Sequence, residues 1–139
     1  MIPRIAYVGG YKYQLDSPYV VVVGLRPDGP TIETRYLKLR PDGTLTIKEG
    51  YAWDGPSGPA IDTKNFLRGS LVHDALYQLM RKRLLDREIW RDDADRELQR
   101  ICLEDGMSKL RAWWVYQGVR FGGGPSADPD NDNLVRYAP

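Results

Sequence analysis

Residues 73–77 read His-Asp-Ala-Leu-Tyr and bring together the chain's single histidine, a carboxylate and a phenol. His73 and Tyr77 are four positions apart, so on a helix they lie on the same side. An imidazole with one ring nitrogen bonded to a carboxylate can use its other nitrogen as a general base toward water. The segment therefore indicates proton-transfer chemistry centred on His73, provided that a carboxylate faces the ring.

The helix that carries this segment is predicted over residues 66–82, and its apolar side chains cover more than half of its circumference. A mostly buried helix has one polar strip, which here consists of Ser70, His73, Asp74, Tyr77 and Arg81. Burying such groups costs free energy unless they find partners. On a second helix, predicted over residues 87–104, Asp95 lies at the edge of the apolar stripe. We expect Asp95 to face the first helix and bond to His73.

Other kinds of site are excluded by the composition. Cys102 is the only cysteine, so the chain has no intrachain disulfide and no cysteine-based metal site, and we expect this residue in the core. One histidine is too few for a multi-histidine metal centre, and neither a Gly-x-Ser-x-Gly elbow nor a P-loop occurs. The His73 set remains the strongest candidate for catalysis.

A loop of unusual composition precedes the first helix. Residues 50–59 read Gly-Tyr-Ala-Trp-Asp-Gly-Pro-Ser-Gly-Pro, a pattern that neither a helix nor a strand accommodates. Two explanations stay open: the glycines and prolines serve tight turns alone, or the loop binds an ion or ligand. Asp54 fits either explanation, as an ion ligand or as the side chain of an Asx turn.

Residues 51–105 resemble the catalytic core of phospholipase A₂, most closely its prokaryotic branch. The resemblance rests on the glycine-rich Tyr/Trp loop, on the His-Asp-x-x-Tyr pattern, and on the Arg-Asp-Asp-Ala-Asp segment that ends at Asp95. It implies that His73 activates the attacking water, that Asp95 orients His73, and that Tyr77 bonds to Asp95.

The same resemblance implies a Ca²⁺ site. It assigns the metal to Asp74 and to the backbone carbonyls of Trp53, Gly55 and Ser57. Ca²⁺ prefers hard oxygen ligands, and a loop of glycines and prolines can turn several carbonyls toward one carboxylate. An ion held there would polarise an ester carbonyl and stabilise the oxyanion.

The chain as a whole is similar to a small domain family of unknown function from bacteriophages and prophages. The similarity rests on the loop at 53–59, on Leu-Val-His-Asp-Ala-Leu-Tyr at 71–77, and on Tyr-Gln-Gly-Val-Arg-Phe-Gly at 116–122. Together the two resemblances imply a phage-encoded, Ca²⁺-dependent phospholipid ester hydrolase acting on the host envelope. The alternative is a non-catalytic part of the virion, in the tail, baseplate or neck. In that case the His/Asp set is vestigial, a buried hydrogen-bond network that specifies the fold.

An α+β fold is predicted from the order of the elements. Residues 1–50 form an antiparallel β-meander, since Val-, Ile- and Tyr-rich stretches alternate with turns, among them two Arg-Pro-Asp-Gly segments. The strands are expected at 11–15, 18–24, 32–39 and 44–48. Residues 51–65 form the glycine/proline loop. Three helices follow within residues 66–121, at 66–82, at 87–104 with Asp86 as N-cap, and at 109–121 with Ser108 as N-cap. Residues 1–121 are thus predicted to form one domain.

Charge and hydropathy limit the partners. Twenty basic and nineteen acidic residues leave a net charge of +1, so we expect no nucleic-acid partner. No apolar run is long enough for a transmembrane segment. The N-terminus lacks the pattern of a signal peptide, so we expect the protein in the host cytoplasm or built into the virion. The polar segment 122–139 is predicted to be a tail that makes assembly contacts with other virion proteins.

The third helix allows two interpretations. Residues 110–116 combine arginine with tryptophan and tyrosine, a composition found in helices that lie on membrane surfaces. Aromatic side chains also supply much of the buried area in a small domain, so we expect this helix to pack in the core.

Overall fold

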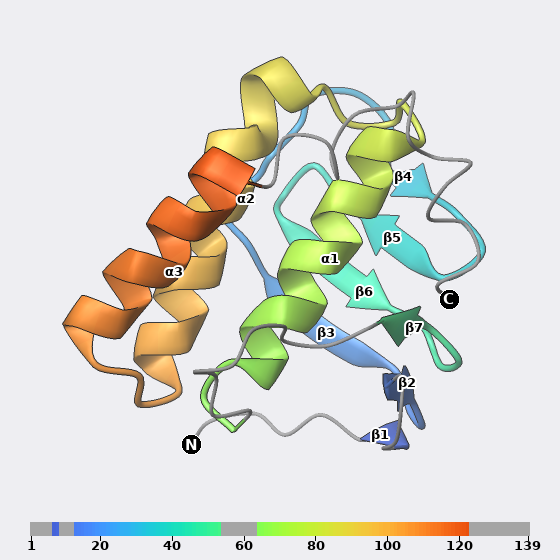
Figure 1. The fold of residues 1–139 in the computed structure, drawn as a ribbon. Helices are drawn as coiled ribbons and strands as arrows, with labels where there is room; N and C mark the ends of the chain where they lie inside the picture. The colour runs from blue at the N-terminus through green and yellow to red at the C-terminus, as the bar shows by residue number, and fades with distance from the viewer. Residues whose placement is uncertain (1–6, 9–12, 54–63, 123–139) are drawn as a thin grey trace.

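The computed structural model describes residues 7–8, 13–53 and 64–122. Antiparallel strands in two sheets come first and three helices follow, which confirms the predicted α+β arrangement. Figure 1 shows α1 lying across the four-stranded sheet, with α2 and α3 side by side next to it.

The four-stranded sheet has the order β3 (Tyr19–Val22), β6 (Thr44–Ile47), β5 (Leu37–Leu39), β4 (Ile32–Glu33). The pairing of β5 with β6 is the one that the predicted meander required. The meander is wrong at β3, which pairs with β6 rather than with the strand that follows it in the sequence. Sequence alternation in β6 is confirmed, since Leu45 and Ile47 are buried.

The predicted single strand at 32–39 is wrong, because a tight turn divides it into β4 and β5. The Thr34 backbone N–H donates to the Leu37 carbonyl at 2.8 Å, and the Leu37 N–H donates to Thr34 Oγ1 at 3.1 Å. A threonine side chain completes this turn without glycine or proline, so the usual turn signals are missing.

The second sheet has the order β1 (Tyr7–Val8), β2 (Tyr13–Leu15), β7 (Ala52–Trp53). β7 lies inside the segment predicted as a loop, so that prediction is wrong for these two residues. Trp53 is opposite Tyr13 in the register, and the two rings are 5.5 Å apart. The strand β7 forms because it pairs with β2, which is distant in the sequence. The local composition therefore does not predict it.

The helices begin and end within one residue of their predicted bounds: α1 at Leu67–Arg81, α2 at Arg87–Glu104, α3 at Lys109–Gly122. Asp86 caps α2 as predicted, because its side chain accepts from the Glu88 N–H at 2.9 Å. Ser108 Oγ accepts from the Arg111 N–H at 3.2 Å at the start of α3.

The main core lies between α1 and the four-stranded sheet, where leucine and isoleucine side chains of β5 and β6 meet Leu71, Ala75 and Leu79. A second cluster joins α2 and α3 and includes Cys102, buried as predicted. At Gly69 of α1 a Cβ atom would lie 2.9 Å from a methyl group of Leu98, so glycine permits the close approach of α2.

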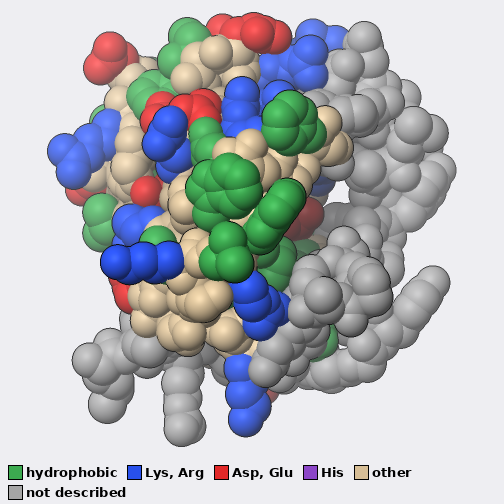
Figure 2. Space-filling view, turned by 60° about the vertical axis from the view of Figure 1, so that its left-hand side comes forward, with side chains coloured by type: hydrophobic (Ala, Val, Ile, Leu, Met, Phe, Trp, Pro, Cys, Tyr) green, Lys and Arg blue, Asp and Glu red, His purple; other side chains and the backbone are tan. Residues whose placement is uncertain are grey.

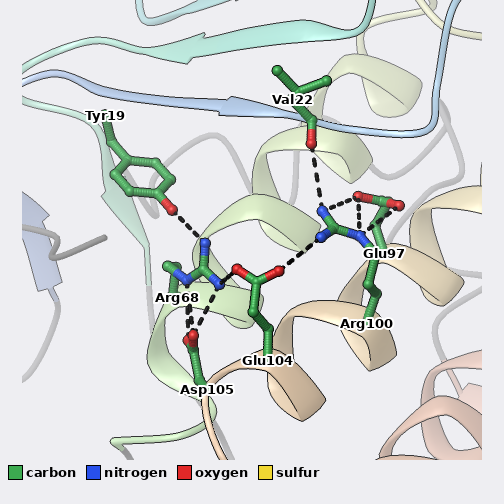
Figure 3. A network of polar contacts seen from close by, with 7 residues as sticks. All are labelled: Tyr19, Val22, Arg68, Glu97, Arg100, Glu104 and Asp105. Carbon is green, nitrogen blue, oxygen red and sulfur yellow. Dashed lines mark hydrogen bonds and ion pairs between the residues drawn. The ribbon is translucent and has the colours of Figure 1, made fainter. Parts of the chain in front are cut away.

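A buried ion pair fixes the start of α1. Arg68 donates to both carboxylate oxygens of Asp105, to Glu104, and through Nη1 to the Tyr19 hydroxyl at 2.9 Å. Figure 3 shows its guanidinium held among these three side chains. The sheet, the first turn of α1 and the end of α2 are thereby tied together, and with them the helix pair that carries the His73 set.

Candidate functional site

His73 and Asp95 meet between α1 and α2, as predicted. The His73 Nε2 atom lies 2.7 Å from Asp95 Oδ1. The Asp95 side chain has no exposed surface, whereas 13% of the His73 side chain is exposed. The carboxylate is therefore sealed inside the helix pair, and the imidazole sits at its edge.

Tyr77 completes this contact. Its hydroxyl donates to Asp95 Oδ1 at 2.6 Å, and its ring packs against the imidazole with the centroids 4.1 Å apart. Burial raises the pKa of the Tyr77 phenol above its usual value, and the hydrogen bond to Asp95 adds a smaller shift in the same direction. The phenol consequently keeps its proton and remains a donor. Arg91 Nε donates in turn to the Tyr77 hydroxyl at 3.2 Å.

Arg120, which the sequence did not single out, also binds the Asp95 carboxylate. It comes from the last turn of α3, and its Nη1 atom donates to Asp95 Oδ2 at 3.1 Å. Arg91 fixes that turn by donating to the backbone carbonyls of Val119 and Arg120 at 2.9 and 2.7 Å. Only the crossing of α3 over α2 brings Arg120 to this place. In the sequence, the only indication of this contact was that a buried carboxylate needs a basic partner.

The tautomer of His73 follows from these bonds. Asp95 receives a phenol proton and a guanidinium proton, so it acts as an acceptor, and the proton between it and the imidazole belongs to Nε2. In the neutral ring Nδ1 then carries the lone pair. The described residues offer Nδ1 no hydrogen-bond partner. Within the described ranges, one nitrogen of His73 is therefore bound to protein and the other has no protein partner.

Asp74, expected as the metal-binding carboxylate, lies beside His73 on α1 and accepts a hydrogen bond from the Tyr51 hydroxyl through Oδ2. Burial, reinforced by the Asp74 charge, raises the pKa of the Tyr51 phenol well above its usual value, so Tyr51 stays a donor. The Tyr51 ring stacks on Trp53, with the centroids 6.5 Å apart.

Trp53 is the only one of the three predicted loop ligands that the structure describes, and Gly55 and Ser57 lie outside the described residues. The Trp53 indole N–H donates to Ser70 Oγ at 3.2 Å. Ser70 is one turn before Asp74 on α1, so the start of the loop is anchored next to the predicted carboxylate. Within the described ranges no three His, Cys, Asp or Glu side chains are grouped to hold a metal.

The structure brings together His73, Tyr77 and Asp95. Asp74 directly follows His73 on α1, and Trp53 on β7 is bonded to Ser70, one turn earlier on the same helix. Comparison with protein families, curated proteins and solved structures finds no match to this chain. None of the described helices is both long and apolar enough to cross a bilayer.

Proposed function

We propose that this protein is a phage-encoded hydrolase that cleaves phospholipid esters of the host envelope with the help of Ca²⁺. The observation that carries the proposal is the 2.7 Å contact between His73 Nε2 and the fully buried Asp95, which leaves Nδ1 as the base. The resemblance of residues 51–105 to phospholipase A₂ supplies the substrate class.

In the proposed reaction His73 Nδ1 takes a proton from water as the water oxygen attacks the ester carbonyl carbon. Asp95 holds the ring and offsets the positive charge that develops on the imidazolium. Tyr77 and Arg120 keep the carboxylate in place through its two oxygens. When the ester C–O bond breaks, the imidazolium returns the proton to the leaving alkoxide, giving a fatty acid and a lysophospholipid.

Of the proposed ligands, the structure describes Asp74 and Trp53, and both fit a Ca²⁺ ion in their chemistry, because they offer a carboxylate and a backbone carbonyl oxygen. Tyr51 orients the Asp74 carboxylate, and the bond between Trp53 and Ser70 holds the start of the loop beside it. Asp74 and the carbonyls of Trp53, Gly55 and Ser57 would hold the ion. A bound Ca²⁺ would polarise the ester carbonyl.

The test is the release of fatty acid from mixed phospholipid vesicles, with Ca²⁺ and with a chelator, by wild-type protein and by His73→Gln. We expect His73→Gln to lower the rate by roughly 10²–10⁴-fold. A second variant, Asp95→Asn, removes the carboxylate that contacts His73. Its matched control is Asp93→Asn, because both carboxylates are on α2 and only Asp95 contacts His73. Equal rates for wild type and His73→Gln would refute the proposal.

A non-catalytic virion component is the second candidate. It is favoured by the complete burial of Asp95 and by its three donors, since such a network can serve to fix the packing of three helices. This candidate predicts no turnover by wild-type protein, together with a loss of stability on Asp95→Asn.

A further inference from the structure

The outer face of α3 carries large apolar side chains that the protein leaves in solvent. Leu110 is 67% exposed, Trp113 45%, Trp114 62% and Phe121 87%. Their spacings of three, four and seven residues place them on one side of the helix, over a length of about 16 Å. We call these four residues the α3 outer face.

This face is not needed to hold α3 on the protein. The opposite side of the helix, formed by Ala112, Val115 and Val119, packs on the cluster that joins α2 and α3. The expectation that the aromatic residues of this helix pack in the core is therefore wrong for Trp113 and Trp114. Their indole rings contact each other edge to face, with the centroids 5.1 Å apart, at the surface.

The borders of the α3 outer face are basic. α3 contains Lys109, Arg111 and Arg120 and no acidic residue. At about 100° per residue, Lys109 falls along one border and Arg111 along the other. Arg120 lies on the same side as Lys109, but its guanidinium pairs with Asp92 and Asp95 and is not counted as part of the border. Figure 2 shows hydrophobic side chains gathered on this face of the molecule, with Lys and Arg groups beside them. The charge of the helix thus complements an anionic partner.

We infer that the α3 outer face binds the surface of an anionic phospholipid bilayer. Tryptophan is enriched where membranes meet water, because its ring is apolar and its N–H is polar. Exposed apolar side chains on one side of a helix can sink into a fluid interface, while basic groups at the border, such as Lys109, meet the headgroup phosphates. This inference concerns binding alone, so it stands or falls independently of hydrolysis at His73.

Pairing of two α3 outer faces in a dimer fits the charges less well. A twofold contact would bring the basic side chains of both helices together, with no acidic side chain of either α3 between them. The observations therefore favour the bilayer over a second copy of the chain.

The test is co-sedimentation of the full chain with vesicles in the presence of a chelator, so that Ca²⁺-dependent turnover plays no part. One set of vesicles is pure phosphatidylcholine, and the other contains equal parts of phosphatidylglycerol and phosphatidylcholine. We expect at least tenfold tighter binding to the anionic vesicles, weakened by added salt. The double variant Trp114→Ala/Phe121→Ala should bind at least about tenfold more weakly, and Lys109→Glu at least about fivefold more weakly.

Val20→Thr is the control, because Val20 is an exposed apolar residue on β3. It should bind as tightly as wild type, and all variants should keep the wild-type thermal midpoint, since the changed side chains are exposed. Equal binding of wild type to the two kinds of vesicle would overturn the inference. So would unchanged binding by the double variant, or a wild-type dimer in analytical ultracentrifugation that the double variant abolishes.

Discussion

Replacing Arg68 by methionine tests how the start of α1 is held. The Arg68 side chain is 5% exposed, and its partner Asp105 is 6% exposed. Methionine keeps much of the volume and removes the charge together with all donors to Asp105, Glu104 and Tyr19. The change therefore leaves the Asp105 carboxylate buried without its counter-charge.

The expected loss is about 3–5 kcal/mol of unfolding free energy, because an unpaired buried charge is far more costly than a lost surface pair. Glu104 adds little to this figure, since its side chain is 43% exposed. Domains of this kind have about 5–15 kcal/mol in total, so the variant should be strongly destabilised.

Urea unfolding followed by circular dichroism measures this loss. With a slope of about 2 kcal/mol/M, the midpoint should fall by about 2 M. Arg96→Met is the matched control, because Arg96 and its partner Asp92 are both solvent-exposed, and the urea midpoint of this variant should stay close to that of the wild type. Adding Asp105→Asn to Arg68→Met should restore part of the stability. If Arg68→Met loses no more than Arg96→Met, the assignment of a structural role to this pair is refuted.

Three further outcomes follow from the structure. Gly43→Ala should lower the free energy of unfolding by about 1–3 kcal/mol, because φ is +92° and the new Cβ would lie 2.4 Å from a backbone oxygen. In thermal unfolding Gly29→Ala should lose less, because its new Cβ meets no atom within 4 Å. Burial raises the pKa of the Cys102 thiol to about 12, so at pH 8 an aromatic disulfide reagent should modify it only in denaturant, and rapid modification of native protein would contradict its burial. The hydrogen bond from Arg68 lowers the pKa of the Glu104 carboxyl. Glu104 therefore contributes stability above its unfolded-state pKa, and this stability is lost as the pH falls through its folded-state pKa. Thermal midpoints measured from pH 7 to pH 3 should decline, and a flat profile would contradict this.

The helices could be predicted from the sequence because their signals are local. Asp86 is a good N-cap directly before an apolar periodic segment, and the structure uses it as one. The meeting of His73 with Asp95 was predictable for a different reason. A buried helix with one polar strip needs partners for that strip, and Asp95 was the acid on the neighbouring helix nearest its apolar stripe.

The remaining features depend on contacts between distant parts of the chain. The strand β7 exists because Ala52 and Trp53 pair with β2, and nothing in those two residues demands it. Arg120 reaches Asp95 only because α3 crosses α2. Helical periodicity marks a face as apolar without showing whether another element covers it. For this reason the expected burial of Trp113 and Trp114 is wrong, and both residues lie at the surface.

In the proposed site, Asp95 holds the proton on Nε2 of His73 and leaves Nδ1 as the base. His73 is the only histidine, so ¹⁵N-labelled protein gives a single pair of imidazole nitrogen signals. In the neutral ring we expect a protonated Nε2 and an unprotonated Nδ1. Asp95→Asn should alter this preference, and Asp93→Asn should leave it unchanged. A neutral ring in wild-type protein that carries its proton on Nδ1 would rule out Asp95 as the residue that sets the His73 tautomer.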